Sequence, residues 1–509
     1  TTLFRSDVKY TGKHYFLSGF YSYYNATIGI LSAAHVGSTN DLYDAIKNKR
    51  PSVIKDFTYT IDNPKQEVQH HLAKLNYQYY FDETASLSSQ YSFQFNKRLE
   101  FDVRRGSLNN LAALDLELST HNLNVDFKKT YHDWHLKSGV NAGFQNNFAS
   151  PATGIRPLIP NYEKLDAGVY GIASVSLSDG LVLDGGLRYD FSKVDAKKFY
   201  FKSRWTERGY DVLFPQFEVR EVGDQILAHP TFTFHNLSAS LGFRKTFDKQ
   251  WDWYTNISLA TRNPNPSEFF SDGLHHSSGM IELGDLALKK EQSIKLSSTV
   301  QKTWNNFSLE VNPYINAVQN YMFLRPIRPE TTNRGTFLVW EYQQTNALLG
   351  GVDVQTNWTI NSQWQHRFTM AYIKGDDLDN DEPLIDMPPF HFTNTIEFKK
   401  KEWHELLLEL KSEVVTQQQS YPNNNFEITV IENGNLVPRE LDISTPPAGY
   451  HLLHFYSEMK FNTFYKTTTT LGFSVQNIFN TNYRDYLNRQ RFFADEVGRN
   501  FQIQIKFNY

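Results

Sequence analysis

Apolar and polar residues alternate strictly over stretches of about ten residues, and such stretches recur along the whole chain. Alternation with a period of two is typical of a β-strand whose two faces meet different surroundings. The stretch 181–191, for example, places Leu187 and Tyr189 on one face and Arg188 and Asp190 on the other. The pattern therefore predicts an all-β chain that is built from many similar strands.

Coarse boundaries place nineteen strands along the 509 residues. They cover 3–11, 13–30, 66–81, 85–102, 112–129, 133–148, 163–178, 180–194, 230–248, 250–262, 291–304, 306–324, 336–360, 363–375, 389–400, 403–418, 449–462, 467–480 and 499–509. In the strand 112–129 the apolar phase changes between Leu118 and Leu123. This change predicts either a β-bulge or a wrong boundary at that strand.

The connections between these strands alternate between tight and long. Tight turns lie at 11–12, 179, 361–362 and 401–402. Long excursions cover 31–65, 195–229, 263–290 and 419–448. The strands of a soluble sandwich would alternate in the same way, but its long loops would have no reason to gather at one end. Short periplasmic turns and long extracellular loops are typical of outer-membrane barrels, so we predict a transmembrane antiparallel β-barrel.

The number of strands carries a further expectation. Bacterial single-chain barrels have even strand numbers, and a chain that ends in the periplasm after about nineteen strands must begin on the extracellular side. Three more strands would complete a 22-stranded barrel, whose lumen is wide enough to hold a plug. We therefore expect residues 1–509 to form one barrel domain that lacks an N-terminal plug and the first three strands.

The composition agrees with a barrel and removes several function classes. Aromatic residues make up 15% of the chain, although only 40% of residues are hydrophobic. This combination suits half-buried strands with aromatic girdles, to which we assign Tyr21, Tyr23 and Tyr24. A formal net charge of −4 gives no basic field for nucleic acid. The absence of cysteine excludes disulfides and thiol chemistry, and no apolar run is long enough for a transmembrane helix.

Five motifs in the second half of the chain are similar, in order, to segments of the TonB-dependent receptor family. They are Ala260-Thr261-Arg262-Asn263-Pro264 with Glu268-Phe269, Gly284-Asp285 with Leu288-Lys289-Lys290-Glu291-Gln292-Ser293, Pro383-Leu384 with Met387-Pro388-Pro389, Val475-Gln476-Asn477-Ile478-Phe479-Asn480 with Tyr483, and Gly498-Arg499-Asn500 before the last strand. In the second motif Leu286 and Lys290 stand where the family has proline. Over residues 1–250 the likeness rests mainly on the rhythm of the strands.

The resemblance implies a receptor in the bacterial outer membrane that the TonB energy-transducing complex drives through an N-terminal plug. It implies active import of a scarce ligand, with a metal chelate such as a ferric siderophore or haem as the leading expectation. A TonB-dependent peptide or glycan importer is the runner-up, and a passive porin or surface adhesin is the alternative of a different class. Other expected partners are outer-membrane lipid and lipopolysaccharide.

The last strand carries the family's closing pattern, in which apolar residues alternate up to the terminal aromatic. The resemblance implies that the barrel-assembly machinery recognises this pattern, whose members are Phe501, Ile503, Ile505, Phe507 and Tyr509. No nucleophile with a base, HExxH helix, phosphate loop or dinucleotide fingerprint occurs in the chain. We therefore expect no enzyme activity and no resident cofactor.

The long loop 263–290 holds the most suggestive candidate for ligand binding. Asp272, His275 and His276 supply a carboxylate and two imidazoles, which can ligate zinc, copper or haem iron. Adjacent histidines point in different directions on an extended backbone, so chelation by both would need a turn, which Gly273 could permit. The alternative is a loop that contains histidines without a bound metal.

Three further groups are candidates of other kinds. Arg104 and Arg105 could meet an anionic ligand at the mouth of the lumen. A run of carboxylates has the spacing of a calcium site, with a charged loop tip as its alternative; its members are Asp376, Asp377, Asp379, Asp381 and Glu382. His70 and His71 lie inside a strand, so one ring should face the lumen and the other the lipid or girdle, in structural roles.

Overall fold

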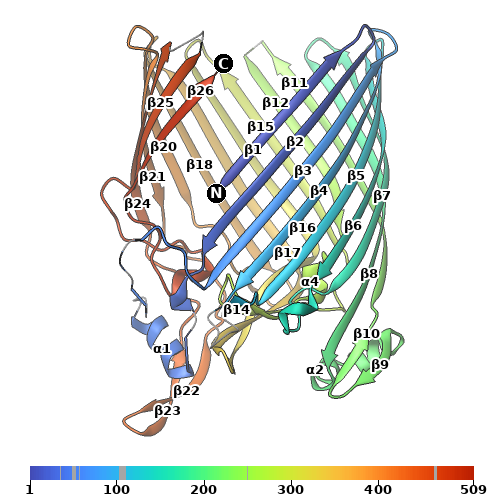
Figure 1. Cartoon of the computed structure of the whole chain (residues 1–509). Coiled ribbons are helices and arrows are strands. Elements are labelled where there is room, and N and C mark those ends of the chain that lie inside the picture. The colour runs from blue at the N-terminus through green and yellow to red at the C-terminus, as the bar shows by residue number, and fades with distance from the viewer. Residues whose placement is uncertain are drawn as a thin grey trace.

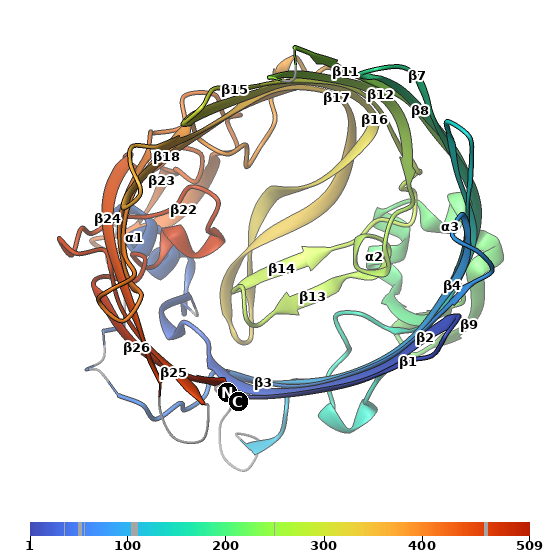
Figure 2. The same cartoon turned by 90° about the horizontal axis from the view of Figure 1, so that it is seen from above.

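The computed structural model describes residues 1–509 except 35, 49–52, 55, 57, 103–109, 249, 463–466 and 509. Within these residues, twenty-four strands join in one sheet, which curves into the barrel of Figures 1 and 2. Five of the twenty-four, β9, β10, β13, β14 and β19, are short strands in loops, and the other nineteen form the wall. The first and last wall strands lie next to one another around the ring (Figure 2).

The wall strands follow one another in chain order and pair antiparallel with their neighbours. They are β1 (Thr2–Thr11), β2 (Tyr15–Gly29), β3 (Lys65–Tyr80), β4 (Ala85–Phe101), β5 (Leu114–Tyr131), β6 (Trp134–Ala149), β7 (Asn161–Ser178), β8 (Leu181–Phe201), β11 (Thr231–Phe247), β12 (Trp251–Arg262), β15 (Glu291–Thr303), β16 (Phe307–Thr332), β17 (Gly335–Thr359), β18 (Trp364–Asp377), β20 (His391–Lys400), β21 (Leu406–Val415), β24 (Tyr450–Asn462), β25 (Thr468–Gln476) and β26 (Asn500–Asn508). Each corresponds to one of the nineteen predicted strands.

The remaining elements lie in the loops. They are helices α1 (Thr39–Asn48), α2 (Lys202–Glu207), α3 (Tyr210–Leu213) and α4 (Pro266–Phe270), and strands β9 (Glu218–Val222), β10 (Gln225–Ala228), β13 (Asp272–His275), β14 (Met280–Leu283), β19 (Glu382–Pro383), β22 (Phe426–Glu432) and β23 (Asn435–Leu441). No helix of the described residues is long and apolar enough to cross a membrane. Strands β8 and β16 run well past their predicted ends because they leave the wall and pair with other loop segments.

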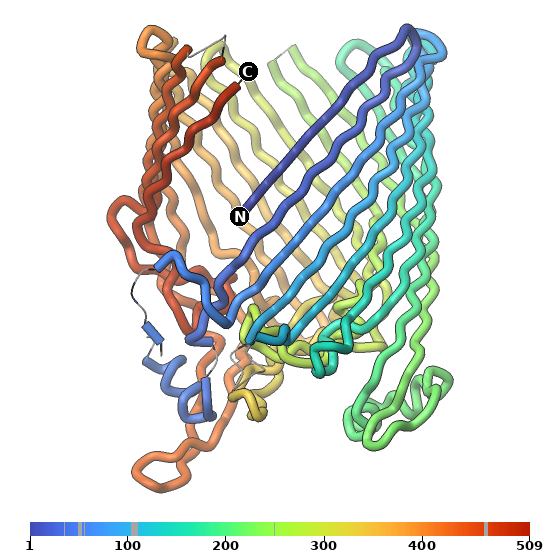
Figure 3. The backbone as a smooth tube through the Cα atoms, in the orientation of Figure 1, coloured from blue at the N-terminus to red at the C-terminus, as the bar shows by residue number. Residues whose placement is uncertain are grey.

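The two ends of the barrel differ as the loop lengths predicted. Figure 1 shows the tight turns at one end, whereas α1, α2 and the hairpins β9–β10 and β22–β23 extend from the other. The strands run obliquely to the axis of the barrel (Figure 3). Since short turns face the periplasm in such barrels, the long loops mark the extracellular end.

The apolar side chains of the wall are not in a protein core. Leu187 is 57% exposed and Leu241 is 63% exposed, although both lie in the middle of long strands. The largest buried side chains belong instead to the loops, as Trp205 does, or to the extracellular extension of a wall strand, as Trp340 of β17 does. A soluble sandwich would bury the alternating face, so this distribution excludes the sandwich and leaves lipid as the partner of the wall.

Aromatic side chains form a belt on the lipid side at each end of the wall. Seven of the nine tryptophans are exposed and lie near the tight turns: Trp134, Trp251, Trp253, Trp304, Trp358, Trp364 and Trp403. Tyr21 and Tyr23 belong to the belt near the loops, as predicted, but Tyr24 shares the lumen face with the buried Ser22 and Ala26. The assignment of Tyr24 to the girdle was therefore wrong.

The predicted bulge in β5 is absent. This strand pairs with β4 and β6 in continuous register. Leu114 and Leu118 face the lumen, where Leu114 is buried and Leu118 packs against buried residues of the loops, whereas Leu123 and Phe127 face the lipid. The alternation never slips, because the lumen face itself becomes apolar where the loops fold onto it.

Candidate functional site

A hairpin lies in the middle of the extracellular opening. It consists of β13 and β14, residues 272–283, and we call it the central hairpin; Figure 2 shows it inside the ring. Strand β14 is buried along its whole length and pairs in parallel with Leu338–Glu341 of β17. The loops therefore enclose a partly closed extracellular vestibule above the lumen.

The first motif clamps the chain that enters the central hairpin. Helix α4 begins at a capping box, in which Asn265 accepts from the backbone of Glu268 and the side chain of Glu268 accepts from the backbone of Asn265. Arg262 Nη1 donates to both carboxylate oxygens of Glu268 at 2.9 Å, and Arg262 Nη2 donates to Glu291 Oε2 at 3.2 Å. Arg262 thus ties the first motif to the second.

The second motif clamps the chain that leaves the central hairpin. A Cβ atom on Gly284 would lie 2.6 Å from the carbonyl carbon of Phe269, so only glycine allows this approach of two backbones. Asp285 Oδ1 accepts from the hydroxyl of Tyr210 at 2.8 Å and from the backbone of Ala287 at 2.9 Å. The motif therefore fixes both α3 and the exit of the hairpin.

Residues of the fourth motif have the same structural character. Asn477 is buried with φ of 49°, and its side chain exchanges two hydrogen bonds with the backbone of Thr481, at 2.9 and 2.8 Å. Asn480 Oδ1 accepts from the backbone of Arg499 at 2.8 Å, in the fifth motif. These motif residues thus hold the loops in place through hydrogen bonds and close backbone contacts.

His275 and His276 lie on the central hairpin and point to different partners, as an extended backbone requires. His275 Nδ1 lies 2.6 Å from Glu282 Oε1, and its Nε2 lies 3.2 Å from Arg98 Nη2. The buried His276 is held by the carboxylate of Asp102 at 3.3 Å and by Arg334 Nη1 at 3.2 Å. Both nitrogens of His275 and Nε2 of His276 have hydrogen-bond partners, and Nδ1 of His276 has only the ion-pair contact with Asp102. The geometry therefore favours a structural role for both rings over metal ligation.

Asp272 is the centre of a buried ionic cluster at the base of the central hairpin. Arg156 Nη1 lies 3.3 Å and Lys198 Nζ 3.7 Å from Asp272 Oδ2, and Lys198 also donates to the carbonyl of Phe270. Lys198 is in the extracellular extension of β8, beyond the part that pairs with β11. Burial lowers the pKa of Lys198 to about 7, although the carboxylate of Asp272 acts in the opposite direction.

This pKa predicts that docking of the central hairpin strengthens with pH. Between pH 7 and the ordinary lysine pKa of 10.5, the undocked state binds more protons than the docked state, so docking gains up to about 1.4 kcal/mol per pH unit. We expect hydrogen exchange at 272–283, corrected for the intrinsic rate, to slow over this window. Lys198→Met should remove the pH dependence, and a slope that persists in this variant would contradict the assignment.

The carboxylates proposed for calcium already have protein partners, in their own loop and in the strands β16 and β17. Asp377 Oδ1 accepts from Thr345 and from the backbones of Asp379 and Asn380, and Asp379 accepts from Asn346 at 2.8 and 3.0 Å. Asp376 pairs with Lys374 and Glu382 with Arg325, and Asp381 turns the chain with φ of 54°. Across the described residues, no group of three or more His, Cys, Asp or Glu side chains is placed to hold a metal ion.

The structure places the remaining residues that the sequence predicted for binding, assembly or structural roles as follows. Arg104, Arg105 and Tyr509 lie outside the described residues. The apolar residues of the last strand, Phe501, Ile503, Ile505 and Phe507, are all exposed along β26. His70 faces the lumen and lies 3.5 Å from Asn96, whereas His71 faces the lipid side beside Tyr21, which agrees with the predicted division.

Two of the cavities between the extracellular loops are lined by several cationic side chains, and the first of these, which we call the basal cavity, has about 540 Å³. It lies beside the central hairpin, and Arg204, Arg208 and Arg328 line it together with Glu341 and Asp285. Arg208 is held by Glu341 at 2.8 Å, whereas Arg328 is 40% exposed and pairs with Glu330 at 3.2 Å. The basal cavity therefore offers guanidinium groups, of which Arg328 is the most accessible.

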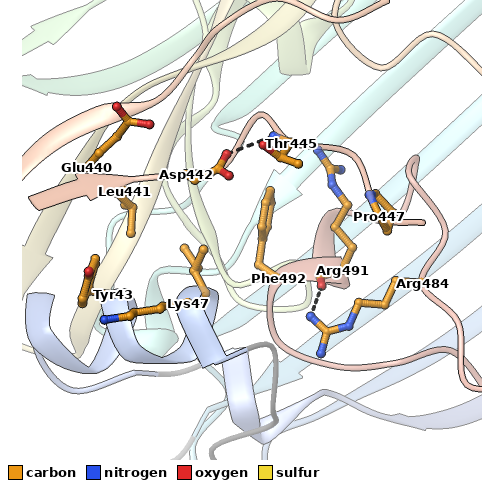
Figure 4. Close-up of a pocket in the computed structure, with 11 residues that line it drawn as sticks. Tyr43, Lys47, Glu440, Leu441, Asp442, Thr445, Pro447, Arg484, Arg491 and Phe492 are labelled. Atoms are coloured by element: carbon orange, nitrogen blue, oxygen red, sulfur yellow. Dashed lines mark hydrogen bonds between the residues drawn. The ribbon is translucent and has the colours of Figure 1, made fainter. Parts of the chain in front are cut away.

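The second, the rim cavity, has about 300 Å³ and joins three segments that are far apart in the sequence (Figure 4). Helix α1 contributes Tyr43 and Lys47, the β22–β23 segment contributes Leu441, and the last loop contributes Arg491 and Phe492. Burial lowers the pKa of Arg491, which only partly regains it from Asp386. The rim cavity thus combines apolar side chains with cations and with the carboxylates Glu440 and Asp442.

Sequence reasoning missed the arginines of the basal cavity. Arg204, Arg208 and Arg328 lie in loop helices and in the loop extension of β16, where no periodic pattern or motif marks them. They meet only because β16 and β17 continue past the wall and turn toward α2. The sequence gives no signal for this contact.

Comparisons with known proteins agree with the architecture. A family model described as "TonB dependent receptor-like, beta-barrel" matches residues 4–501. No curated protein matches the chain. Among solved structures, the chain is similar to the copper transporter OprC, with a TM-score of 0.70 and 13% identity over 98% of this chain and 70% of that one. At such identity the likeness shows the fold alone.

Two further structures have the same barrel. The FrpB iron transporter from Neisseria meningitidis (F3-3 variant) has a TM-score of 0.64 and 15% identity over 99% of this chain and 70% of that one. The ferric yersiniabactin uptake receptor FyuA from Yersinia pestis has a TM-score of 0.59 and 10% identity over 96% of this chain and 66% of that one. These relatives in fold are transporters and receptors rather than enzymes. With nineteen tilted wall strands, a lipid-facing apolar surface and a family match along nearly its whole length, the chain belongs to the TonB-dependent receptor family of the bacterial outer membrane.

Proposed function

We propose that the protein imports a metal chelate, such as a ferric siderophore or haem, by TonB-dependent transport. The observation that supports this most directly is the basal cavity, where Arg204, Arg208 and Arg328 meet in the vestibule. Carboxylate, catecholate and hydroxamate oxygens of such chelates match the planar guanidinium, which binds oxygens through two hydrogen bonds. A volume of about 540 Å³ is in the range of small-molecule sites.

The similar solved structures support the same ligand class by analogy. They are a copper transporter, an iron transporter and an uptake receptor for a ferric siderophore. Because the identities are low, this support concerns the class of ligand and not a particular molecule. A role for Asp272, His275 and His276 in ligand binding would be indirect, through the position of the central hairpin.

The family implies an interaction with TonB, and the proposal includes the partners that the sequence suggested. We propose an N-terminal plug, three further wall strands, contact with lipopolysaccharide, and recognition of Phe501, Ile503, Ile505 and Phe507 by the barrel-assembly machinery. An intact mass of the receptor from native membranes tests the plug. A mass equal to that of residues 1–509 would contradict it.

A substitution at the accessible arginine tests the ligand class. Arg328→Gln in the complete receptor should weaken binding of a ferric catecholate, ferric hydroxamate, haem or copper chelate by about tenfold to a hundredfold, because one charge-assisted contact is lost. Titration of the purified receptor with each probe measures the change. Arg220→Gln, in the exposed hairpin β9–β10, makes the same charge change away from the cavity and should leave binding unchanged.

The alternatives predict different results in the same assay. Binding of oligopeptides or oligosaccharides, with no response to the four chelates, would favour the peptide or glycan importer. Liposomes that hold the complete receptor should not leak small sugars. Free passage of such sugars would favour the passive porin and exclude import through a plugged barrel.

A further inference from the structure

Three tyrosine–histidine pairs repeat on the lipid side of the wall. In each, the tyrosine hydroxyl lies 2.7 or 2.8 Å from Nδ1 of a histidine on the next wall strand. The pairs are Tyr21 with His71, Tyr91 with His121, and Tyr189 with His235. We call them the Tyr–His pairs.

Each pair is built in the same way by three strand pairings. The residue two positions after the tyrosine is aromatic and lies directly opposite the histidine: Tyr23 opposite His71, Phe93 opposite His121, and Phe191 opposite His235. The centroids of these opposed rings are 4.8, 4.8 and 5.6 Å apart. Packing and the hydrogen bond together fix the orientation of each imidazole.

The position of the pairs across the membrane follows from β3. Eight residues separate His71 from Tyr79 near the tight turns, which is about 26 Å along the strand and about 20 Å across the membrane at the usual tilt. The apolar band of an outer-membrane barrel is about 25 Å tall. Since the tryptophan belt marks the periplasmic edge of this band, the Tyr–His pairs lie at its extracellular edge, where the headgroups of the outer leaflet begin.

The hydrogen bond determines which ring nitrogen is a donor. A phenol in an apolar belt needs an acceptor, and Nδ1 of the histidine is the acceptor beside it. When the tyrosine donates to Nδ1, the neutral imidazole carries its proton on Nε2. No described residue accepts a hydrogen bond from Nε2 of these three rings, and an unsatisfied donor at the edge of hydrocarbon is unfavourable. An acceptor outside the protein is therefore required.

Lysines accompany the pairs on their extracellular side. On β4, Lys97 lies two residues after Phe95, which is opposite His71. On β8, Lys193 lies two residues after Phe191, which is opposite His235. Both lysines are on the lipid face of their strands. Lys290 Nζ donates to the backbone carbonyl of His235 at 3.1 Å. Glu117 already pairs with Lys97 at 2.7 Å, whereas Lys193 is exposed. Neutral N–H donors below cations suit a headgroup that carries phosphate.

We propose that the three Tyr–His pairs form a binding surface for the phosphate-bearing headgroup of an outer-leaflet glycolipid, that is, lipopolysaccharide. The Nε2–H groups donate to oxygens of the headgroup, the lysines above them attract its phosphates, and the aromatic rings contact the start of the acyl chains. The inference rests on the lipopolysaccharide contact proposed above and gives it a location. The surface lies on the outside of the barrel, so its test does not depend on the ligand imported through the vestibule.

The experiment compares lipid retention by three forms of the complete receptor. The triple variant His71→Phe, His121→Phe, His235→Phe keeps the ring packing and removes the donors. The matched control, His366→Phe, changes a lipid-facing histidine opposite Trp358 in the periplasmic belt. Each delipidated protein is incubated with lipopolysaccharide micelles, with phosphatidylglycerol vesicles or with inorganic phosphate, and bound phosphorus per barrel is measured by native mass spectrometry.

The wild type and the control should retain lipopolysaccharide, and the triple variant should bind it about tenfold more weakly. Equal retention by all three proteins would overturn the proposal, as would equal binding of phosphatidylglycerol or of free phosphate by the wild type. If the triple variant fails to form a barrel on heat-modifiable electrophoresis, Tyr21→Phe, Tyr91→Phe, Tyr189→Phe replaces it. That variant frees Nδ1 and should also retain less lipopolysaccharide; unchanged retention would equally overturn the proposal.

Discussion

Gly284→Ala should displace the central hairpin and reduce chelate uptake by the complete receptor by at least about tenfold. The added Cβ would lie 2.6 Å from the carbonyl carbon of Phe269 and 2.7 Å from the backbone oxygens of Glu268 and Phe269. Backbone atoms cannot move aside like the end of a flexible side chain. The exit of the hairpin must therefore shift, at a cost of about 3 kcal/mol.

Hydrogen exchange at residues 271–285 measures the displacement directly. Gly284 now donates from its backbone to the carbonyl of Ser271 at 2.6 Å, and this amide should lose its protection. The control is Gly171→Ala, in the wall strand β7, where an added Cβ would meet nothing within 4 Å. If Gly284→Ala showed the same hydrogen exchange and the same chelate uptake as the control, the close approach of the two backbones at the base of the hairpin would have no functional importance.

Arg262→Met should loosen the same loop from its other end. The substitution leaves the buried carboxylate of Glu268 without its cation and removes the contact with Glu291. Since the side chain of Arg262 is 43% exposed, solvent screens part of the loss, and we expect a cost of about 2 kcal/mol in the free energy that docks the loop 262–291. The expected readouts are faster hydrogen exchange in α4 and weaker chelate uptake.

A double variant separates the ion pair from other effects. In Arg262→Met, Glu268→Gln the charge of the buried carboxylate is gone, so most of the docking should return. Arg244→Met removes an exposed pair with Asp252 on the wall and should cost less than about 1 kcal/mol. Strictly additive costs of the two substitutions at 262 and 268 would contradict a direct coupling between them.

Both variants concern residues that the sequence had marked through a family resemblance. The structure gives these residues a physical role: they hold the entry and exit of a hairpin that stands in the extracellular opening. The cavity that supports the proposed function lies beside this hairpin; Asp285 of the second motif is in its lining, but its three arginines lie outside the motifs. A motif in this chain therefore locates the scaffold of the vestibule rather than its binding groups.

Nearly all of the wall could be predicted from the sequence, because each wall strand has two faces in different solvents. Lipid on one side and a polar lumen on the other require apolar and polar side chains to alternate along each wall strand, and this alternation is visible without knowledge of tertiary contacts. The exceptions have the same cause. The pattern predicted a change of phase at Leu118 because apolar residues of the lumen face, Leu114 and Leu118, lie where the loops cover the lumen. It assigned Tyr24 to the girdle because an aromatic residue on the lumen face has the same composition signal as one that faces lipid.

The candidate site could be predicted only in part. Asp272, His275 and His276 do lie in the vestibule, on the central hairpin, but their partners come from β4, β8 and the loops before β7 and β17. The spacing of residues in the sequence cannot show that an imidazole already pairs with a carboxylate from a distant segment, as His276 does with Asp102. The same limit applies to Asp377 and Asp379, whose oxygens accept hydrogen bonds from Thr345 and Asn346 of β17.

By itself, the sequence determined the strands, their two faces, the two ends of the barrel and the family, since these depend on local periodicity and on short motifs. Only the tertiary structure decided which charged groups meet in the vestibule and which histidines pair with tyrosines around the wall. The physical reason is that ion pairs and cavities in loops depend on segments brought together by the closed ring, and distance in the ring is not distance along the chain.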